Sequence, residues 1–288
     1  MIRSFTDLQA AALAACPDLA SLPCRLFGEG WEAAALLFRE DTVVRLSFDA
    51  GSAEAFRREA TVLALVRPAV TLPVPDLSLV DGPPVCTRHR LIPGTPLVTA
   101  GYSTLLEHAR DRLAADLALL HAEIHALPRS ALEAAGATPV PPWDPATIRA
   151  RALPHLAPDA RAWAEAVIDR ADRLPPDPLG EVWGHFDAHG WNMAFDAERE
   201  RLNGILDFGD SGFGPLHRDL VYCALVSPDL MHRTARTYGG LTGRHPDPER
   251  LDLLVDLHRL FDLALDADDP ERRAFKITQV DDRRRSCA

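Results

Sequence analysis

The sequence predicts an α+β protein with a small, mainly antiparallel β lobe at the N-terminus and a larger, mainly helical lobe at the C-terminus. Short apolar runs separated by turn residues fill the first third of the chain. After Ser103, apolar residues recur every three or four positions, as in amphipathic helices. Pro93 and Gly94 interrupt the chain where the pattern changes. We therefore expect lobes over residues 1–93 and 94–288, with the functional cleft between them.

In the N-terminal lobe, the apolar runs 36–38 and 43–46 lie on either side of a polar turn, which predicts a β-hairpin. A helix should follow, with Ser52 as its N-cap and its end at Pro68. Residues 85–92 predict another strand that stops at the Pro–Gly pair.

The C-terminal lobe shows its clearest helical repeat between residues 105 and 127, where leucine and isoleucine recur on one face. Further patterns predict helices over 161–174 and 250–265, and strands over 193–195 and 202–206. Helices should fill the remainder of the chain, and the segment after Asp266, with its DDPERR and DDRRR charge clusters, supports the weakest prediction of order.

Charge and composition exclude several classes of protein. The chain has 288 residues, 47% of them hydrophobic and 25% charged, as in ordinary globular proteins. Its net charge of -11 comes from acidic residues spread along the sequence, so binding to nucleic acid or to an anionic membrane is disfavoured. A cationic small molecule is the better partner for such a surface.

Nothing in the sequence predicts export or membrane insertion. No apolar run approaches the ~20 residues of a membrane span, and the Ala-rich start lacks a basic leader region. The five cysteines are scattered, with no CxxC pair, as expected of reduced thiols in the cytoplasm. We expect a cytoplasmic monomer or homodimer.

Lysine usage limits the phosphate chemistry. Lys276 is the only lysine of the chain, and it follows no glycine-rich loop. A Walker A motif, GxxxxGK[ST], is therefore absent, and any side chain that holds phosphate must be an arginine.

The most informative segment is 184–210, GHFDAHGWNMAFDAERERLNGILDFGD. Asp187 precedes Asn192 by five residues, and Asp207 follows Asn192 by fifteen. Phosphoryl transfer needs a carboxylate that accepts the proton of the attacking hydroxyl, and oxygen ligands for Mg²⁺ on the nucleotide. Asp187 suits the first role, and Asn192 with Asp207 suits the second.

This segment resembles the aminoglycoside phosphotransferase (choline kinase-like) family, whose catalytic loop reads HGDxHxxN and whose metal motif reads DFGD. Phe186 stands where the family has glycine. The resemblance implies a protein kinase-like fold, ATP or GTP as cosubstrate, and Mg²⁺. It makes Asp187 catalytic, Asn192 and Asp207 metal ligands, His185 and His189 residues that orient the loop, and Asp210 a residue of the substrate side.

The resemblance extends to the nucleotide side. The segment LFGEGW is similar to the family's glycine-containing nucleotide loop, and Arg45 and Glu59 stand where a kinase has its phosphate-binding lysine and that lysine's glutamate. A ligand-free salt bridge between Arg45 and Glu59, or a plain hairpin turn at the glycines, would explain the same residues. The nucleotide-binding residues implied are Gly28, Gly30, Arg45, Glu59 and, in the hinge that would face adenine, Arg90 and Ile92.

These observations favour a small-molecule O-kinase whose acceptor carries amino groups, with an aminoglycoside as first choice. One alternative is a metal-dependent hydrolase that uses the HxDxH cluster of His185, Asp187 and His189. Further possible ligands of its Zn²⁺ or Mn²⁺ lie downstream: Asp207, Asp210, His217 and Asp219. Another is a catalytically inactive protein of the same shape that binds a nucleotide without turning it over.

Overall fold

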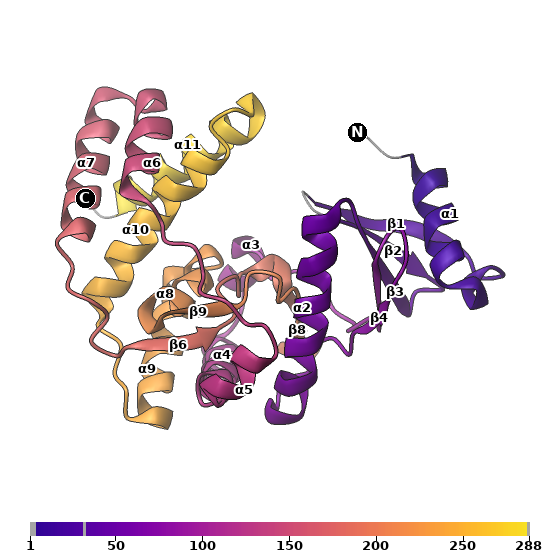
Figure 1. Cartoon of the computed structure of the whole chain (residues 1–288). Coiled ribbons are helices and arrows are strands. Elements are labelled where there is room, and N and C mark those ends of the chain that lie inside the picture. Colours follow the sequence, from indigo (N-terminus) through magenta and orange to yellow (C-terminus); the bar gives the residue numbers. More distant parts are fainter. Residues whose placement is uncertain (1–3, 31–32, 287–288) are drawn as a thin grey trace.

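The computed structural model describes residues 4–30 and 33–286, and it shows the two lobes that the sequence predicts (Figure 1). The N-terminal lobe contains a five-stranded antiparallel sheet with the strand order β1-β2-β3-β5-β4. The strands are β1 (Cys24–Glu29), β2 (Ala33–Phe38), β3 (Thr42–Ser47), β4 (Ser78–Val80) and β5 (Cys86–Arg90).

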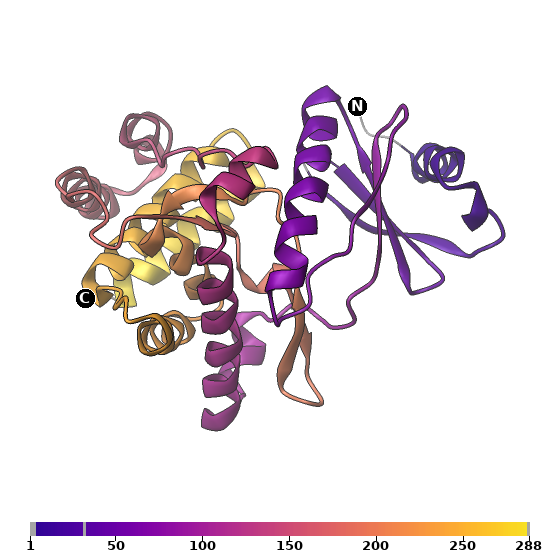
Figure 2. The same cartoon turned by 60° about the horizontal axis from the view of Figure 1, so that its bottom comes forward.

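Two helices, α1 (Phe5–Ala15) and α2 (Ala50–Val66), lie on opposite sides of this sheet (Figures 1 and 2). Leu8 of α1 belongs to a small apolar core with residues of β2 and β3. The C-terminal half of α2, from Val62 to Val66, instead joins the main core of the helical lobe. Helix α2 therefore connects the packing of the two lobes.

The predicted hairpin is present as β2 and β3, and its turn places Arg39 and Glu40 at positive φ. The predicted N-cap of α2 was wrong. The cap is Asp49, whose side chain accepts a hydrogen bond from Ser52 N, while Ser52 Oγ accepts one from Asp49 N. Ser52 is thus the third helical residue of a capping box, in the position that glutamate or glutamine more often fills.

The C-terminal lobe is mainly helical. Its largest core is formed where α4 packs on α9 and where α10 packs on α6, α7 and α11. The helices are α3 (Thr99–Ser103), α4 (Glu107–His125), α5 (Arg129–Ala134), α6 (Pro145–Arg151), α7 (Pro158–Asp172), α8 (Leu216–Leu220), α9 (Pro228–Thr242), α10 (Pro248–Leu265) and α11 (Pro270–Ser286).

Two short strand pairs lie within this lobe: β6 (Glu181–Gly184) pairs with β9 (Gly212–Pro215), and β7 (Met193–Asp196) pairs with β8 (Arg201–Ile205). The β7–β8 hairpin matches the predicted strands. The loops that connect β6 to β7 and β8 to β9 carry the predicted catalytic and metal motifs, so the strand pairs position both motifs.

The connection between the lobes depends on Gly94. Its φ is +153°, and a Cβ there would lie 2.5 Å from the backbone of Ala194. The next residue, Thr95, pairs with Phe195 of β7 through a hydrogen bond of 2.9 Å. The hinge therefore lies directly against the strand that follows the catalytic loop.

Helix α1 had no counterpart in the sequence analysis, and α11 lies in the segment where the prediction of order was weakest. The Ser4 side chain caps α1 by accepting from Asp7 N. Helix α11 uses its charged residues in ion pairs, among them Arg283 with Asp256 at 2.6 Å. In the described part of the chain, no helix combines the length and the apolar character that crossing a bilayer requires.

Candidate active site

The loop between β6 and β7 is fixed by His185, whose side chain is completely buried. Its Nε2 donates to the Leu206 carbonyl at 2.9 Å, and its Nδ1 accepts from the Asp187 N–H at 3.2 Å. Burial lowers the pKa of His185 to about 4, so the ring is neutral at pH 7, as this pattern of one donor and one acceptor requires. His185 therefore joins the loop to the end of β8.

Asp187 lies at the centre of the site. Its carboxylate accepts a hydrogen bond of 2.8 Å from Asn192 Nδ2, and its Oδ1 lies 3.4 Å from Nε2 of His189. Burial, together with the charges of Asp210 and Asp207, raises the pKa of Asp187 to about 8. A carboxylate whose basicity is raised in this way is suited to accept a proton from a hydroxyl group.

Glu59 connects α2 to the β3 arginine and to the DFG motif. Its carboxylate is buried and accepts from Arg45 Nη1 at 2.8 and 2.9 Å and from Phe208 N at 3.3 Å. Arg45 also lies 3.7 Å from Asp207. Burial raises the pKa of Glu59 and the Arg45 charge opposes that rise, as expected of a buried ion pair. The structure thus brings together three residues that the sequence analysis placed on the nucleotide side.

A buried cluster of Asp219, His121 and His125 supports the loop, and the sequence analysis gave the two histidines no role. Asp219 accepts from Phe186 N at 2.6 Å and contacts His121 Nδ1 and His125 Nε2, each at 2.8 Å. Burial raises the pKa of Asp219, but the two histidines outweigh it and hold that pKa far below its usual range. The spacing HAEIH, with two histidines four residues apart on one helix face, was the available signal.

Comparison with known proteins agrees with this geometry. The model of the phosphotransferase enzyme family matches residues 23–283, which is most of the chain. The chain belongs to this family. No protein with a curated description matches the sequence.

Solved structures confirm the kinase-like fold of this phosphotransferase. A GDP complex of wild-type aminoglycoside 2′-phosphotransferase-IIIa matches with a TM-score of 0.85 at 20% identity, over 99% of this chain and 100% of that one. The GDP and kanamycin complex of APH(2″)-IIIa matches with a TM-score of 0.82 at 20% identity, over 97% and 98%. A macrolide 2′-phosphotransferase from Brachybacterium faecium matches with a TM-score of 0.69 at 22% identity, over 94% and 97%.

The predicted metal ligands of the phosphotransferase suit a hard cation. Asp207 supplies an exposed carboxylate, and Asn192 uses its Nδ2 on Asp187, which leaves its Oδ1 for a ligand. Carboxylate and carboxamide oxygens are ligands that Mg²⁺ prefers. The mutual repulsion of Asp187, Asp207 and Asp210 is a second reason, because a divalent cation would relieve it. The residues present therefore fit Mg²⁺.

Phe186, which replaces the glycine of the family motif, retains a glycine-like backbone. Its φ is +55°, in the left-handed region, and its ring is buried against β9 beneath the Arg218 guanidinium, 5.7 Å away. Packing of the ring thus holds a conformation that costs about 1 kcal/mol or more for a residue with a side chain.

The other predicted nucleotide residues lie at the edge of the N-terminal lobe. Gly28 is in β1 next to an irregularity in the register, and Gly30 N donates to Ala33 O at 2.9 Å. The end of the predicted loop, Trp31, lies outside the described residues. Arg90 ends β5, and Ile92 follows it towards the hinge.

The HxDxH residues do not form a metal site. Within the described residues, the three groups close enough to share an ion are His121, His125 and Asp219, and both histidines are already hydrogen-bonded to Asp219. His185 is turned to the Leu206 carbonyl and away from a shared centre with Asp187 and His189. The geometry therefore gives no support to the hydrolase alternative.

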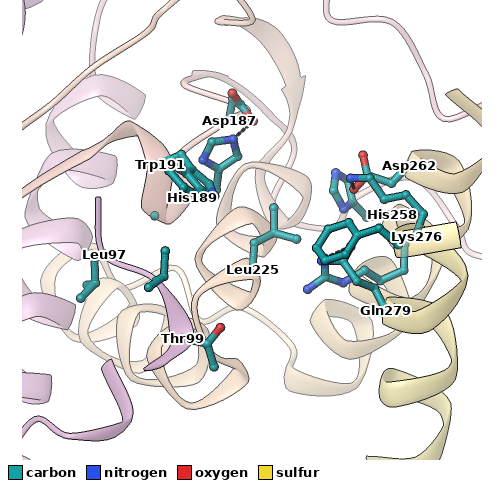
Figure 3. Close-up of a pocket in the computed structure, with 14 residues that line it drawn as sticks. Leu97, Thr99, Asp187, His189, Trp191, Leu225, His258, Asp262, Lys276 and Gln279 are labelled. Carbon is teal, nitrogen blue, oxygen red and sulfur yellow. Dashed lines mark hydrogen bonds and ion pairs between the residues drawn. The ribbon is translucent and has the colours of Figure 1, made fainter. Parts of the chain in front are cut away.

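A cavity of about 440 Å³ opens beside Asp187 (Figure 3). Of the residues that line it, the sequence analysis assigned only Asp187 and His189 to the site. Asp187, His189 and Trp191 line one side, while residues of α10 and α11 line the other. Asp210, predicted for the substrate side, is exposed; its charge reaches Asp187, but it does not line this cavity. Tertiary packing of the C-terminal helices creates the second wall, so no local motif encodes it.

Proposed function

We propose that this phosphotransferase moves the γ-phosphoryl group of ATP or GTP to a hydroxyl of an amino-bearing small molecule. The observation that carries the proposal is the position of Asp187, which lines the cavity and contacts Asn192 on the side of the DFG motif. A hydroxyl in the cavity can therefore meet a phosphoryl group held by the N-terminal lobe.

Asp187 accepts the hydroxyl proton as the oxygen attacks the γ-phosphorus, and the bond to the β–γ bridging oxygen breaks to release ADP or GDP. Arg45, held by Glu59, contacts the α- and β-phosphates through its remaining guanidinium donors. Asn192 and Asp207 would hold Mg²⁺, which when bound would neutralise charge on the phosphate oxygens. His185 and Asp219 keep the loop in place while the proton moves.

Two kinds of amino-bearing acceptor are the first to test. Aminoglycosides follow from the sequence analysis and from the kanamycin complex of the similar structure, and macrolides follow from the second kind of similar structure. An ammonium group would be attracted to the carboxylates of Asp187, Asp207 and Asp210 around the reacting position. Phosphorylation of either class would modify an antibiotic.

The test is release of ADP or GDP in a coupled assay with aminoglycosides, macrolides and simple amino alcohols, with mass spectrometry of the products. A phosphorylated product would support the proposal. Tight nucleotide binding without product from any alcohol would favour the inactive, nucleotide-binding alternative.

The metal assignment gives a further prediction. Asp207→Ala should weaken Mg²⁺-dependent nucleotide binding more than Asn192→Ala, because a carboxylate contributes a charge and a carboxamide contributes only a dipole. Calorimetric titration of nucleotide with and without a chelator measures both effects. Equal affinity in the two conditions would contradict the magnesium assignment.

A further inference from the structure

The cavity beside Asp187 has walls of different character. Asp187 and His189 lie on one side, and Asp262, Lys276 and Gln279 lie across from them on α10 and α11 (Figure 3). The strongly acidic composition of the chain predicts a surface that attracts cations, but the far wall contains the only lysine of the sequence. The net charge of the chain therefore does not describe this cavity, and the charge of each lining residue decides which ligand groups it attracts.

The acidic group of the far wall is already neutralised. Asp262 accepts from Lys276 Nζ at 2.6 Å, and Asp266 lies 3.9 Å from the same nitrogen. Although burial raises it, the neighbouring cationic groups hold the pKa of Asp262 below its usual value. The pair therefore leaves no free carboxylate for an ammonium group of a ligand.

Arg259 is the remaining charged group of the far wall. Its Nη1 donates to Gln279 Oε1 at 3.2 Å, and in residues 4–30 and 33–286 no carboxylate lies within ion-pair distance of it. Burial lowers the pKa of Arg259, but an arginine in a protein stays ionised. The Asp262 carboxylate acts on Arg259 through its charge but makes no ion-pair contact with it. A partly buried guanidinium whose hydrogen-bond partner in this part of the chain is neutral is well suited to bind an anionic or carbonyl oxygen.

Apart from the Asp187 carboxylate, the rest of the lining is neutral or apolar. Burial lowers the pKa of His258 to about 4, so its ring is uncharged at pH 7. Trp191 and Phe275 are 69% and 60% exposed, unusually much for aromatic residues, and both line the cavity. Exposed aromatic groups beside a cavity are typical of a site that binds an apolar surface.

We infer that the acceptor is amphipathic: it carries an oxygen acceptor group that binds Arg259 and an apolar body that covers Trp191 and Phe275, with its reacting hydroxyl at Asp187. The inference rests on the proposed function in one respect, the placement of the acceptor's reacting hydroxyl at Asp187. It narrows that function to acceptors whose amino groups lie away from Arg259, because a polycation with amino groups along its length would place a positive charge against Arg259.

Calorimetric binding of three probes of equal chain length tests the inference without requiring turnover. The probes are ω-hydroxydodecanoate, its methyl ester and ω-aminododecanol, which differ only at the end away from the hydroxyl. We expect the carboxylate to bind at least ~10-fold tighter than the amine, with the ester in between, because a guanidinium binds a carboxylate more strongly than a neutral carbonyl. An amine that binds as tightly as the carboxylate would overturn the inference.

Variants assign the preference to its residue. Arg259→Gln should abolish the preference for the carboxylate, Arg259→Lys should keep part of it, and Arg173→Gln, exposed and outside the cavity, should keep all of it. Phe275→Ala should weaken all three probes by about the same factor, on the order of 10-fold. A preference that survives in Arg259→Gln would also overturn the inference.

Thermal unfolding of each variant shows whether the fold is retained. The rescue by Arg259→Lys keeps the test valid if the glutamine variant is unstable. Failure of the proposed function would appear separately, as absence of nucleotide turnover with every alcohol, whereas failure of this inference would appear in the probe affinities alone.

Discussion

The nucleotide side and the acceptor side of Asp187 are built in different ways. On the nucleotide side, Arg45 is held by Glu59, which also accepts from Phe208 N, so three separate elements fix one guanidinium before any ligand binds. On the acceptor side, the one hydrogen-bond partner of Arg259 among the described residues is the neutral Gln279, and Trp191 is largely exposed. The nucleotide side is held in place by contacts within the protein. The groups of the acceptor side have few such contacts and remain available to bind a ligand.

This difference indicates which substitutions would affect nucleotide binding and which would affect acceptor binding. A change at Arg45 disturbs a network that spans both lobes, whereas a change at Arg259 or Phe275 alters a wall formed by helices at the C-terminal end. We therefore expect nucleotide binding and acceptor binding to respond to different substitutions. The predictions below test that separation, beginning with the group that both sides share.

Replacement of Asp187 should have the largest effect. Asp187→Asn removes the proton acceptor but preserves the shape, so kcat should fall by about 10³-fold. Nucleotide affinity and the affinity of the acceptor probes should both stay within a few-fold, because the groups that bind them remain. Steady-state kinetics and calorimetry on the same preparation measure this. Retention of most of the wild-type kcat would remove Asp187 from the mechanism.

Loss of the buried carboxylate beneath the loop should reduce stability most. Asp219→Asn leaves His121 and His125 without their charged partner, and the free energy of unfolding should fall by about 3 kcal/mol. Burial lowers the pKa of His121, but Asp219 outweighs it and raises that pKa to about 10. The native state therefore holds a proton that the unfolded state releases above its value of 6.5.

Wild-type stability should consequently fall as the pH rises from 6.5 to about 10, and the variant should show a weaker dependence in that range. Urea unfolding across the range measures both slopes. Asp76→Asn, an exposed change in the N-terminal lobe, is the control. Equal slopes for wild type and Asp219→Asn would show that His121 is not protonated through Asp219.

The sequence was enough to name candidate residues on the nucleotide side, but it assigned no residue of the far wall of the acceptor cavity to the site. Asp187, Asn192 and Asp207 lie within one short segment, where the spacing itself carries the chemistry. The far wall depends on how α10 and α11 pack, and the charged segment that forms α11 showed no apolar periodicity. Ion pairs with α10 take the place of an apolar stripe there, and a single sequence does not reveal such pairs.

Two substitutions at Phe186 measure the cost of backbone strain and the contribution of side-chain packing separately. Phe186→Ala loses the buried ring but keeps the positive φ, so we expect a loss of about 3 kcal/mol. Phe186→Gly loses the same ring but relieves the strain, and its loss should be smaller, about 2 kcal/mol. Chemical denaturation of both variants gives the difference. If the glycine variant is the less stable one, the positive φ carries no strain.

Arg45 should have the smallest effect and the most selective one. Arg45→Ala should raise the nucleotide KM about 10-fold, since it removes charge-assisted hydrogen bonds to phosphate and leaves Glu59 buried without its partner. Arg45→Lys should recover part of this loss, because lysine keeps the charge but cannot bind Glu59 and phosphate with one planar fork. Arg25→Ala, an exposed change on β1, is the matched control.

The acceptor KM should stay within twofold in all three variants, because Arg45 does not line the acceptor cavity. Steady-state kinetics with each substrate varied in turn measure both constants. A parallel rise in the acceptor KM would show that the Arg45–Glu59–Phe208 network also shapes the acceptor side through the DFG segment, and that the two sides are coupled.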